Sequence, residues 1–246
     1  MERYIESSLF VLAGLIVVHV AIVGLNIFKH PGIAARMAPS GPQESRQVAR
    51  GEAKSRIASK IAQGLAKKLR LFGWIGFWLQ LVLAYISALL LAFATTGRAY
   101  NPGSEWFGDA LYLASYGFLL SCFAVVLAFC YTRAARKVVS RPDSYFNQEN
   151  KAAFWLLGTG VLTGLLGVFI SLTGVAVSIS LLIAKTISVP PGTMIMDPTQ
   201  IIRAIDIITL MANFNLLMAH FIGTGITLLL TIRVSIARSE YKEIQE

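Results

Sequence analysis

The feature that most constrains the fold is a series of apolar segments, each longer than 20 residues. A helix rises about 1.5 Å per residue, so each segment can cross the roughly 30 Å hydrocarbon core of a bilayer. The chain is only 14% charged, whereas soluble domains carry roughly 25% charged residues. Because the runs are continuous rather than alternating, we expect an all-α, polytopic helical membrane protein and not a β-barrel. Five transmembrane helices are predicted, at about residues 8–28, 72–95, 109–131, 154–185 and 207–232.

Two of these runs need interpretation. The fourth run, residues 154–185, is longer than the hydrocarbon core requires, so it must tilt, break or extend beyond the bilayer. The first run, residues 8–28, follows two glutamates and one arginine, and its apolar part is longer than that of a signal peptide. We therefore interpret it as a retained N-terminal transmembrane anchor.

The basic residues are distributed unevenly between the spans. The net charge of +9 follows from the excess of Lys and Arg in cytoplasmic loops of membrane proteins, so no nucleic-acid partner is expected. Eighteen of the 22 Lys and Arg residues fall on one side, at residues 29–71, 132–153 and 233–246. This side is predicted to face the cytoplasm, with the N-terminus outside and the C-terminus inside. The predicted organisation is an N-terminal transmembrane anchor (1–28), a basic cytoplasmic linker and amphipathic helix (29–71), a four-helix membrane core (72–233) and a cytoplasmic tail (234–246).

The linker before the second span carries an amphipathic pattern. Ile57, Ile61, Leu65 and Leu69 recur every four residues, with basic residues between them. This pattern is typical of a helix that lies on a membrane surface, where anionic lipid contributes about 1 kcal/mol per basic residue. The alternative is a cytoplasmic segment that only fixes the topology. The predicted membrane-surface residues are Lys54, Arg56, Lys60, Lys67, Lys68 and Arg70.

Short motifs of common catalytic sites do not occur in the sequence. It contains no P-loop, GxGxxG, HExxH, CxxC or GxSxG pattern. Its three histidines are not paired at short spacing, and Cys122 and Cys130 would lie about 12 Å apart on one helix, too far for a disulfide. We therefore expect a protein that is not an enzyme and has no resident cofactor.

A regular series of small residues runs through the fourth span. Their spacings of four and three place them on one helix face. Helices in lipid associate through close backbone packing, which small residues permit. We predict that this face packs on another helix, in the same chain or in a second copy; the alternative is a sliding surface for a conformational change. The residues are Gly160, Gly164, Gly167, Ser171, Gly174 and Ser178.

The fifth span carries polar residues at intervals of seven, with His220 near its centre. A polar group at that depth faces protein or water rather than lipid. Our hypothesis is that His220 lines a polar path; the alternative is a single interhelical hydrogen bond, worth about 0.6 kcal/mol on average. Asp206 either attracts cations to this path, pairs with Arg203 or caps the helix. The polar-path residues are Asp206, Asn213, Asn215, His220, Thr224 and Thr227.

Three potential metal ligands lie at similar depths in different spans. By helical rise, His19, Cys122 and His220 are about 16, 20 and 20 Å below the outer ends of their helices. Imidazole and thiolate together suit Fe(II), Zn(II) or Cu(I). One hypothesis is therefore that these residues hold a transported metal ion, which requires three helices to turn them toward one point.

Three stretches resemble a known family. They are GWIGFWLQLV at residues 73–82 after a basic helix ending KKLR, LLIAKTI at 181–187, and AIDIITLMANFNLLMAHFIG at 204–223. These are similar to the family of the chloroplast inner-envelope translocon component also called permease in chloroplasts, which has cyanobacterial relatives. Asp206, Asn215 and His220 match polar positions of that family's last helix. The first span lies outside the resemblance, since the plastid proteins are interpreted as having four spans.

The resemblance implies a cyanobacterial plasma or thylakoid membrane, or the plastid inner envelope in relatives. It also implies two functions: a permease for iron or another metal ion, and a non-catalytic structural subunit of a protein-translocation or membrane-complex assembly apparatus. Mid-membrane polar groups favour the first, although a divalent-ion path usually has carboxylates in its core. The packing stripe and the basic surface favour the second. For either function the expected partners are membrane lipid and a second copy of the chain or another membrane protein.

Overall fold

The computed structural model describes residues 42–100, 106–146, 152–188 and 202–245, and within these ranges the only regular elements are helices. The predicted first span (8–28) and His19 lie outside the described residues. Each of the four long helices is long and apolar enough to cross a membrane, so the structure agrees with a helical membrane protein and supports four of the five predicted spans. The helices are α2 (Pro42–Tyr100), α3 (Trp106–Ser140), α4 (Pro142–Phe146), α5 (Ala152–Ser188) and α6 (Ala204–Gln245).

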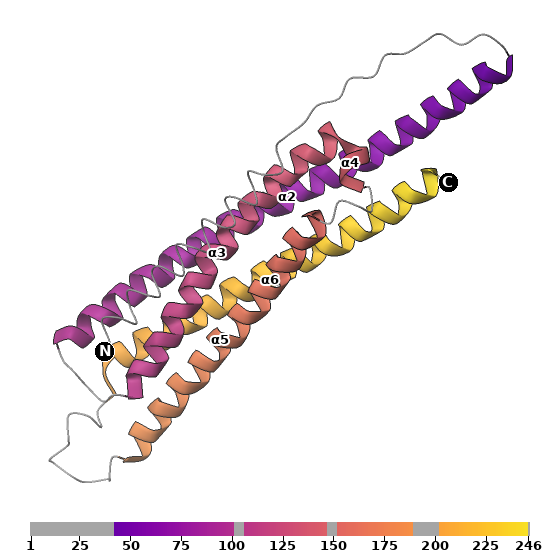
Figure 1. Cartoon of the computed structure of the whole chain (residues 1–246). Coiled ribbons are helices and arrows are strands. Elements are labelled where there is room, and N and C mark those ends of the chain that lie inside the picture. Colours follow the sequence, from indigo (N-terminus) through magenta and orange to yellow (C-terminus); the bar gives the residue numbers. More distant parts are fainter. Residues whose placement is uncertain (1–41, 101–105, 147–151, 189–201, 246) are drawn as a thin grey trace.

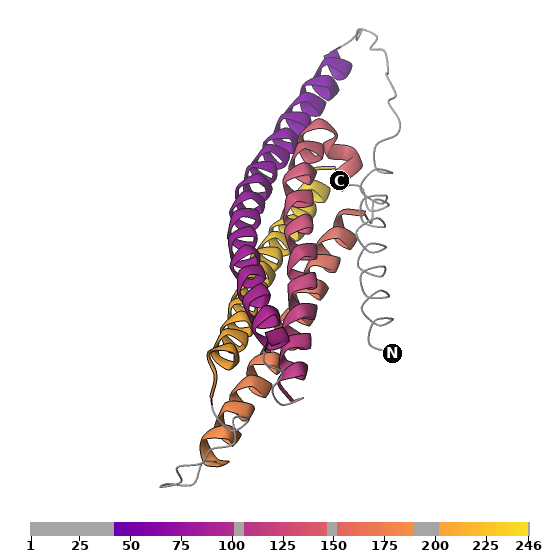
Figure 2. The ribbon, with the colours of Figure 1, turned by 90° about the vertical axis from the view of Figure 1, so that its left-hand side faces the viewer.

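The four long helices lie side by side in one elongated bundle (Figures 1 and 2). α3 and α6 run in one direction and α2 and α5 in the other, as alternate crossings of a bilayer require. The start of α2, the end of α3, the short α4 and the end of α6 therefore gather at one end. We call this end, formed by residues 46–70, 133–146 and 233–245, the basic end. It carries fifteen of the Lys and Arg residues.

Helix α2 is a single rod of 59 residues, about 88 Å long at the usual helical rise. It continues without interruption from the predicted linker helix into the predicted second span, across residues 71 and 72. α6 likewise continues across residues 233 and 234 into the predicted cytoplasmic tail. Both rods are far longer than a hydrocarbon core, so the bundle must extend beyond the bilayer.

The structure differs from the expectation of a helix lying on the membrane surface. Most of the apolar face of residues 54–70 is covered by protein, because Ala58, Ala62, Leu65 and Leu69 are buried in a cluster shared with the other helices. Ile57, one of the residues of the predicted apolar face, is 49% exposed. The buried cluster that includes this end combines five helices. Its members are Ala58, Ala62, Leu65, Ala66 and Leu69 of α2, Leu127, Tyr131, Ala135 and Val138 of α3, Phe146 of α4, Leu157 of α5, and Leu230, Val234, Ala237 and Tyr241 of α6.

An apolar belt surrounds the rest of the bundle. On α2, beyond the isolated Val48 and Ile57, the exposed large apolar side chains form a dense series from Leu71 to Phe93, a distance of about 33 Å by helical rise. Similar side chains cover the outer faces of α5, from Leu162 to Ile187, and of α6, from Ile207 to Ile236. This height matches a hydrocarbon core, which indicates that residues facing outward here contact lipid.

The long fourth run forms one helix. α5 has 37 residues without a break, which settles the choice between one helix and two. The glycines of the predicted stripe face other helices of the bundle, where the absence of a side chain permits close approach.

Candidate functional site

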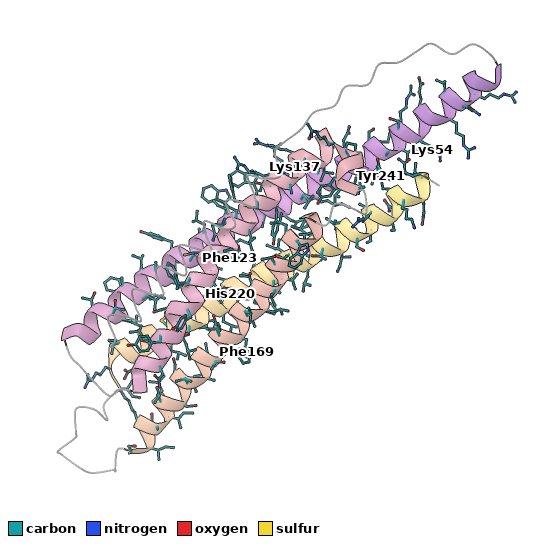
Figure 3. All side chains as sticks on the ribbon, in the orientation of Figure 1. Lys54, Phe123, Lys137, Phe169, His220 and Tyr241 are labelled. Carbon is teal, nitrogen blue, oxygen red and sulfur yellow. The ribbon has the colours of Figure 1, made fainter. Side chains whose placement is uncertain are left out.

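The polar residues predicted on the fifth span face the interior of the bundle. Asp206, Asn213, His220, Thr224 and Thr227 are all buried on α6, and His220 is only 1% exposed. Figure 3 places His220 within the bundle, midway along it. The expectation that these groups face protein instead of lipid is met for the described residues. Asn215, the sixth predicted residue, lies on the neighbouring side of α6 and is partly buried.

The glycines of α5 meet this polar stripe residue by residue. A methyl group added to Gly174 would overlap Asn213, one at Gly167 would overlap His220, and one at Gly164 would overlap Thr224. At Gly160 it would overlap the hydroxyl of Tyr131 and press on Thr227. The remaining stripe members, Ser171 and Ser178, are fully buried. We call this contact between the small stripe of α5 and the polar stripe of α6 the seam.

The partner of the small stripe is therefore α6 of the same chain. The sequence signal for this pairing is the shared interval of seven. The step forward from Gly167 to Gly174 on α5 and the step back from His220 to Asn213 on α6 both cover two turns in the same direction along the bundle. Two antiparallel helices with the same interval keep their facing residues in register. Sequence analysis treated the two stripes separately and did not join them.

Side chains of α6 also bind carbonyl groups of α3. The Nδ2 group of Asn213 donates to the carbonyl oxygen of Ala110 at 3.1 Å, and Nε2 of His220 lies 3.0 Å from the carbonyl oxygen of Gly117. A carbonyl can only accept, so Nε2 carries the hydrogen and Nδ1 of the neutral ring is left as an acceptor. These two bonds, again seven residues apart, attach the polar stripe to α3.

Two further hydrogen bonds connect α6 to α2. Nδ2 of Asn215 donates to the carbonyl oxygen of Leu83 and to Oγ of Ser87, both at 2.7 Å. Asn215 therefore connects two helices and does not line the seam. Sequence analysis assigned Asn215 to the polar path because the sequence predicts the helix that carries it but not the rotation of that helix about its axis.

The far end of the seam is closed by a buried ion pair. Nζ of Lys185 lies 2.6 Å from Oδ2 of Asp206, with the two side chains 11% and 3% exposed. The same oxygen accepts a hydrogen bond from the backbone N–H of Arg203 at 2.9 Å, which satisfies a free donor at the helix start. Of the predicted roles for Asp206, capping and pairing are both present, but its partner is Lys185 of α5 and not the Arg203 side chain.

Of the three residues proposed as metal ligands, the two that the structure describes do not meet. Cys122 is exposed on the outer face of α3, whereas His220 points into the bundle, so the two do not face one site. Among the described residues no three His, Cys, Asp or Glu side chains are grouped as metal ligands. The soft donors Met211 and Met218 also point outward, at 56% and 41% exposure. His19 lies outside the described residues.

The seam contains polar atoms without partners. Within the described ranges, six buried side-chain atoms make no hydrogen bond, although each such group is costly to leave unpaired in an apolar setting. They follow the seam and its flanks from the level of Asn213 to that of Tyr131. These atoms are Asn213 Oδ1, Ser171 Oγ, Ser121 Oγ, His220 Nδ1, Gln80 Oε1 and Tyr131 OH.

Comparison with known proteins places these features in a family. A family described as "Protein of unknown function (DUF3611)" matches residues 59–235. Protein TIC 21, chloroplastic, from Arabidopsis thaliana is 26% identical over 196 residues, which cover 76% of this chain and 64% of that protein. The match thus spans less than two thirds of the relative's own length. No solved structure matches the chain. The resemblance noted at residues 73–82 and 204–223 is confirmed.

Proposed function

We propose that this chain, which belongs to the DUF3611 family of proteins of unknown function, is a membrane permease whose seam carries a metal cation, with iron as the first candidate. The observation that supports this proposal is the row of unpartnered polar atoms along the seam. Polar groups inside a membrane are costly, and they commonly mark the route of an ion or substrate.

The composition of the row suits a cation. Oxygen atoms of amide and hydroxyl side chains and an imidazole nitrogen can all present lone pairs to a positive ion. α6 carries no charged residue between Asp206 and Arg233, so none of its side chains in this interval would bind the ion tightly by charge. The metal is therefore proposed as cargo that passes several weak sites, and not as a resident cofactor.

The seam is closed as it stands, because His220, Thr224 and Asn213 fill the space over the glycines of α5. Passage then requires α5 to shift relative to α6. A face made of Gly and Ser offers little side-chain obstruction to such a shift, which was the alternative reading of the small stripe. Conformational change of one helix group against another is a common means of alternating access.

Uptake of labelled iron by purified protein in liposomes tests the proposal. We expect flux above that of empty vesicles, and reduced flux when His220→Ala removes the central ring. Thr173→Val serves as a control, because Thr173 lies on the exposed side of α5 and bonds only its own helix. Iron uptake that is equal in protein-containing and empty vesicles would exclude the permease.

A second candidate function is that of a structural subunit in a membrane complex. The observation that favours it is the basic end, where fifteen basic residues and only four acidic ones surround a packed core. Lys54 and Tyr241 mark this region in Figure 3. Such a surface can bind an acidic partner protein. On this proposal the basic end faces the cytoplasm or stroma of a cyanobacterial or plastid membrane.

Crosslinking in native membranes tests this second function. A photoreactive group at Ser55, which is exposed on α2, should capture a membrane-complex partner in stoichiometric yield. The same group at Trp78, exposed in the apolar belt, is the control and should capture mainly lipid. Equal and low yields at both sites would argue against an assembly role.

A further inference from the structure

A small cavity lies where all four long helices meet, beside the seam. It has a volume of about 10 Å³ and is lined by apolar residues together with five polar ones. Glycines at positions 76, 160, 164 and 223 form part of its wall, so the helices approach without side chains filling the space. The polar lining residues are Gln80 of α2, Tyr131 of α3, and His220, Thr224 and Thr227 of α6.

Three of these polar residues have atoms without a partner. Gln80, Tyr131 and His220 are 5%, 3% and 1% exposed, and Gln80 Oε1, Tyr131 OH and His220 Nδ1 make no hydrogen bond. The Tyr131 hydroxyl approaches Thr227 without completing a hydrogen bond. Burial of such groups without compensation is unfavourable, so their presence in residues that line one cavity indicates an occupant.

The lining determines the chemistry of that occupant. Gln80 Oε1 can only accept, and His220 Nδ1 accepts because Nε2 donates to Gly117. The hydroxyl hydrogens of Thr224 and Thr227 are already donated to the carbonyl oxygens of His220 and Gly223, at 2.7 and 2.9 Å. The unpartnered Tyr131 hydroxyl can donate as well as accept. The occupant must therefore donate hydrogen bonds to Gln80 Oε1 and His220 Nδ1, and it can accept one from Tyr131.

The size of the cavity limits the occupant further. A volume of about 10 Å³ is the room that one water molecule needs, and a buried water commonly has two to four polar partners. Genuinely empty cavities are lined by apolar groups alone, which this one is not.

We propose that the cavity binds one water molecule, which donates hydrogen bonds to Gln80 Oε1 and His220 Nδ1. This water bridges α2 and α6 beside Gly223, whose position against the Gln80 side chain leaves no room for a methyl group. It also fixes His220 as the tautomer that has its hydrogen on Nε2. This proposal is independent of the proposed iron transport, because it is inferred only from the polar groups that line the cavity.

Solid-state NMR of the full-length protein in lipid bilayers tests the site, with ¹⁵N-labelled His and Gln. We expect magnetisation transfer from water to the side chains of His220 and Gln80, and nitrogen shifts that show a protonated Nε2 and an unprotonated, hydrogen-bonded Nδ1. In Gln80→Leu, which removes the acceptor at similar volume, the water contact of His220 should be lost. Thr173→Val is the control and should keep it.

Two results would overturn the proposal. One is a wild-type spectrum with the expected tautomer but without water contact at either side chain, since a merely structural histidine bonded to Gly117 would give that pattern. The other is a contact from added ¹⁵N-ammonium in place of water, because ammonium is a donor of similar size. Both are read from the wild-type protein, so the test holds even if Gln80→Leu does not fold.

Discussion

At the scale of single residues, the seam depends on the absence of side chains at particular positions of α5. Each stripe glycine leaves room for a polar group of α6, and His220 occupies the place that a side chain at Gly167 would take. Interior packing of proteins is dense, so added volume at such a contact forces neighbours to move. Gly158, on the same helix, has nothing within 4 Å of the position that a methyl would take, and it provides an internal comparison.

We therefore expect Gly167→Ala to destabilise the protein by about 1–3 kcal/mol, as overpacking of a dense interior does. Gly158→Ala should be neutral or stabilising, by up to about 1 kcal/mol, because alanine favours the helix and meets no neighbour there. Thermal unfolding of both variants in the same detergent measures the difference. Equal melting temperatures would show that the glycine of the seam is not in close contact with His220.

The buried ion pair at the far end gives a second prediction at this scale. Lys185→Met leaves Asp206, which is 3% exposed, without its charged partner, and removal of one partner of a buried pair typically costs about 3–5 kcal/mol. The double variant Lys185→Met with Asp206→Asn should recover part of this loss, because no charge then remains buried. Chemical or thermal unfolding of the wild-type protein and the two variants tests it. A double variant less stable than Lys185→Met alone would contradict the pairing.

At the scale of helices, four of the five predicted spans are supported, because the length of an apolar run follows from the thickness of the bilayer. The small stripe and the polar stripe were both recognised, since each follows from spacing along one helix. Their mutual contact was missed because it depends on the rotation of α5 against α6, which single-helix patterns do not contain. An apolar face gives the same sequence pattern whether lipid or another helix covers it, and here Leu65 and Leu69 belong to a buried cluster that is shared with the other helices.

The continuity of α2 can be measured by spin labels at Ser55 and Trp78, one on each side of the boundary at residues 71 and 72. Both positions are exposed. A straight helix separates them by about 35 Å along its axis, whereas a helix lying on the membrane surface would turn sharply near Leu71 and bring them closer. Double electron–electron resonance in bilayers gives this distance, with Trp78 and Phe93 as the control pair within the belt.

At the scale of the whole molecule, the bundle has two parts that share the same helices. The apolar belt exposes large hydrophobic side chains to lipid, while the basic end has a buried apolar cluster and carries most of the basic residues. Family membership and a helical membrane fold were accessible from sequence, because both rest on local patterns. The proposed metal cluster was not supported, since similar depth in three spans does not make side chains converge: Cys122 is exposed, whereas His220 is buried.

The division into belt and basic end predicts a single orientation in the membrane. Because Lys and Arg concentrate in cytoplasmic segments, Ser55→Cys should react with an impermeant thiol reagent only from the cytoplasmic side. Ile187 lies at the opposite end of the bundle and is 77% exposed. Ile187→Cys should therefore react only from the other side. The native cysteines are replaced by Cys122→Ala and Cys130→Ala in both proteins. Labelling of Ser55→Cys from outside would show that the orientation is the reverse of the predicted one. Three crossings, by α2, α3 and α5, separate Ser55 from Ile187, so labelling of both positions from the same side would contradict this arrangement.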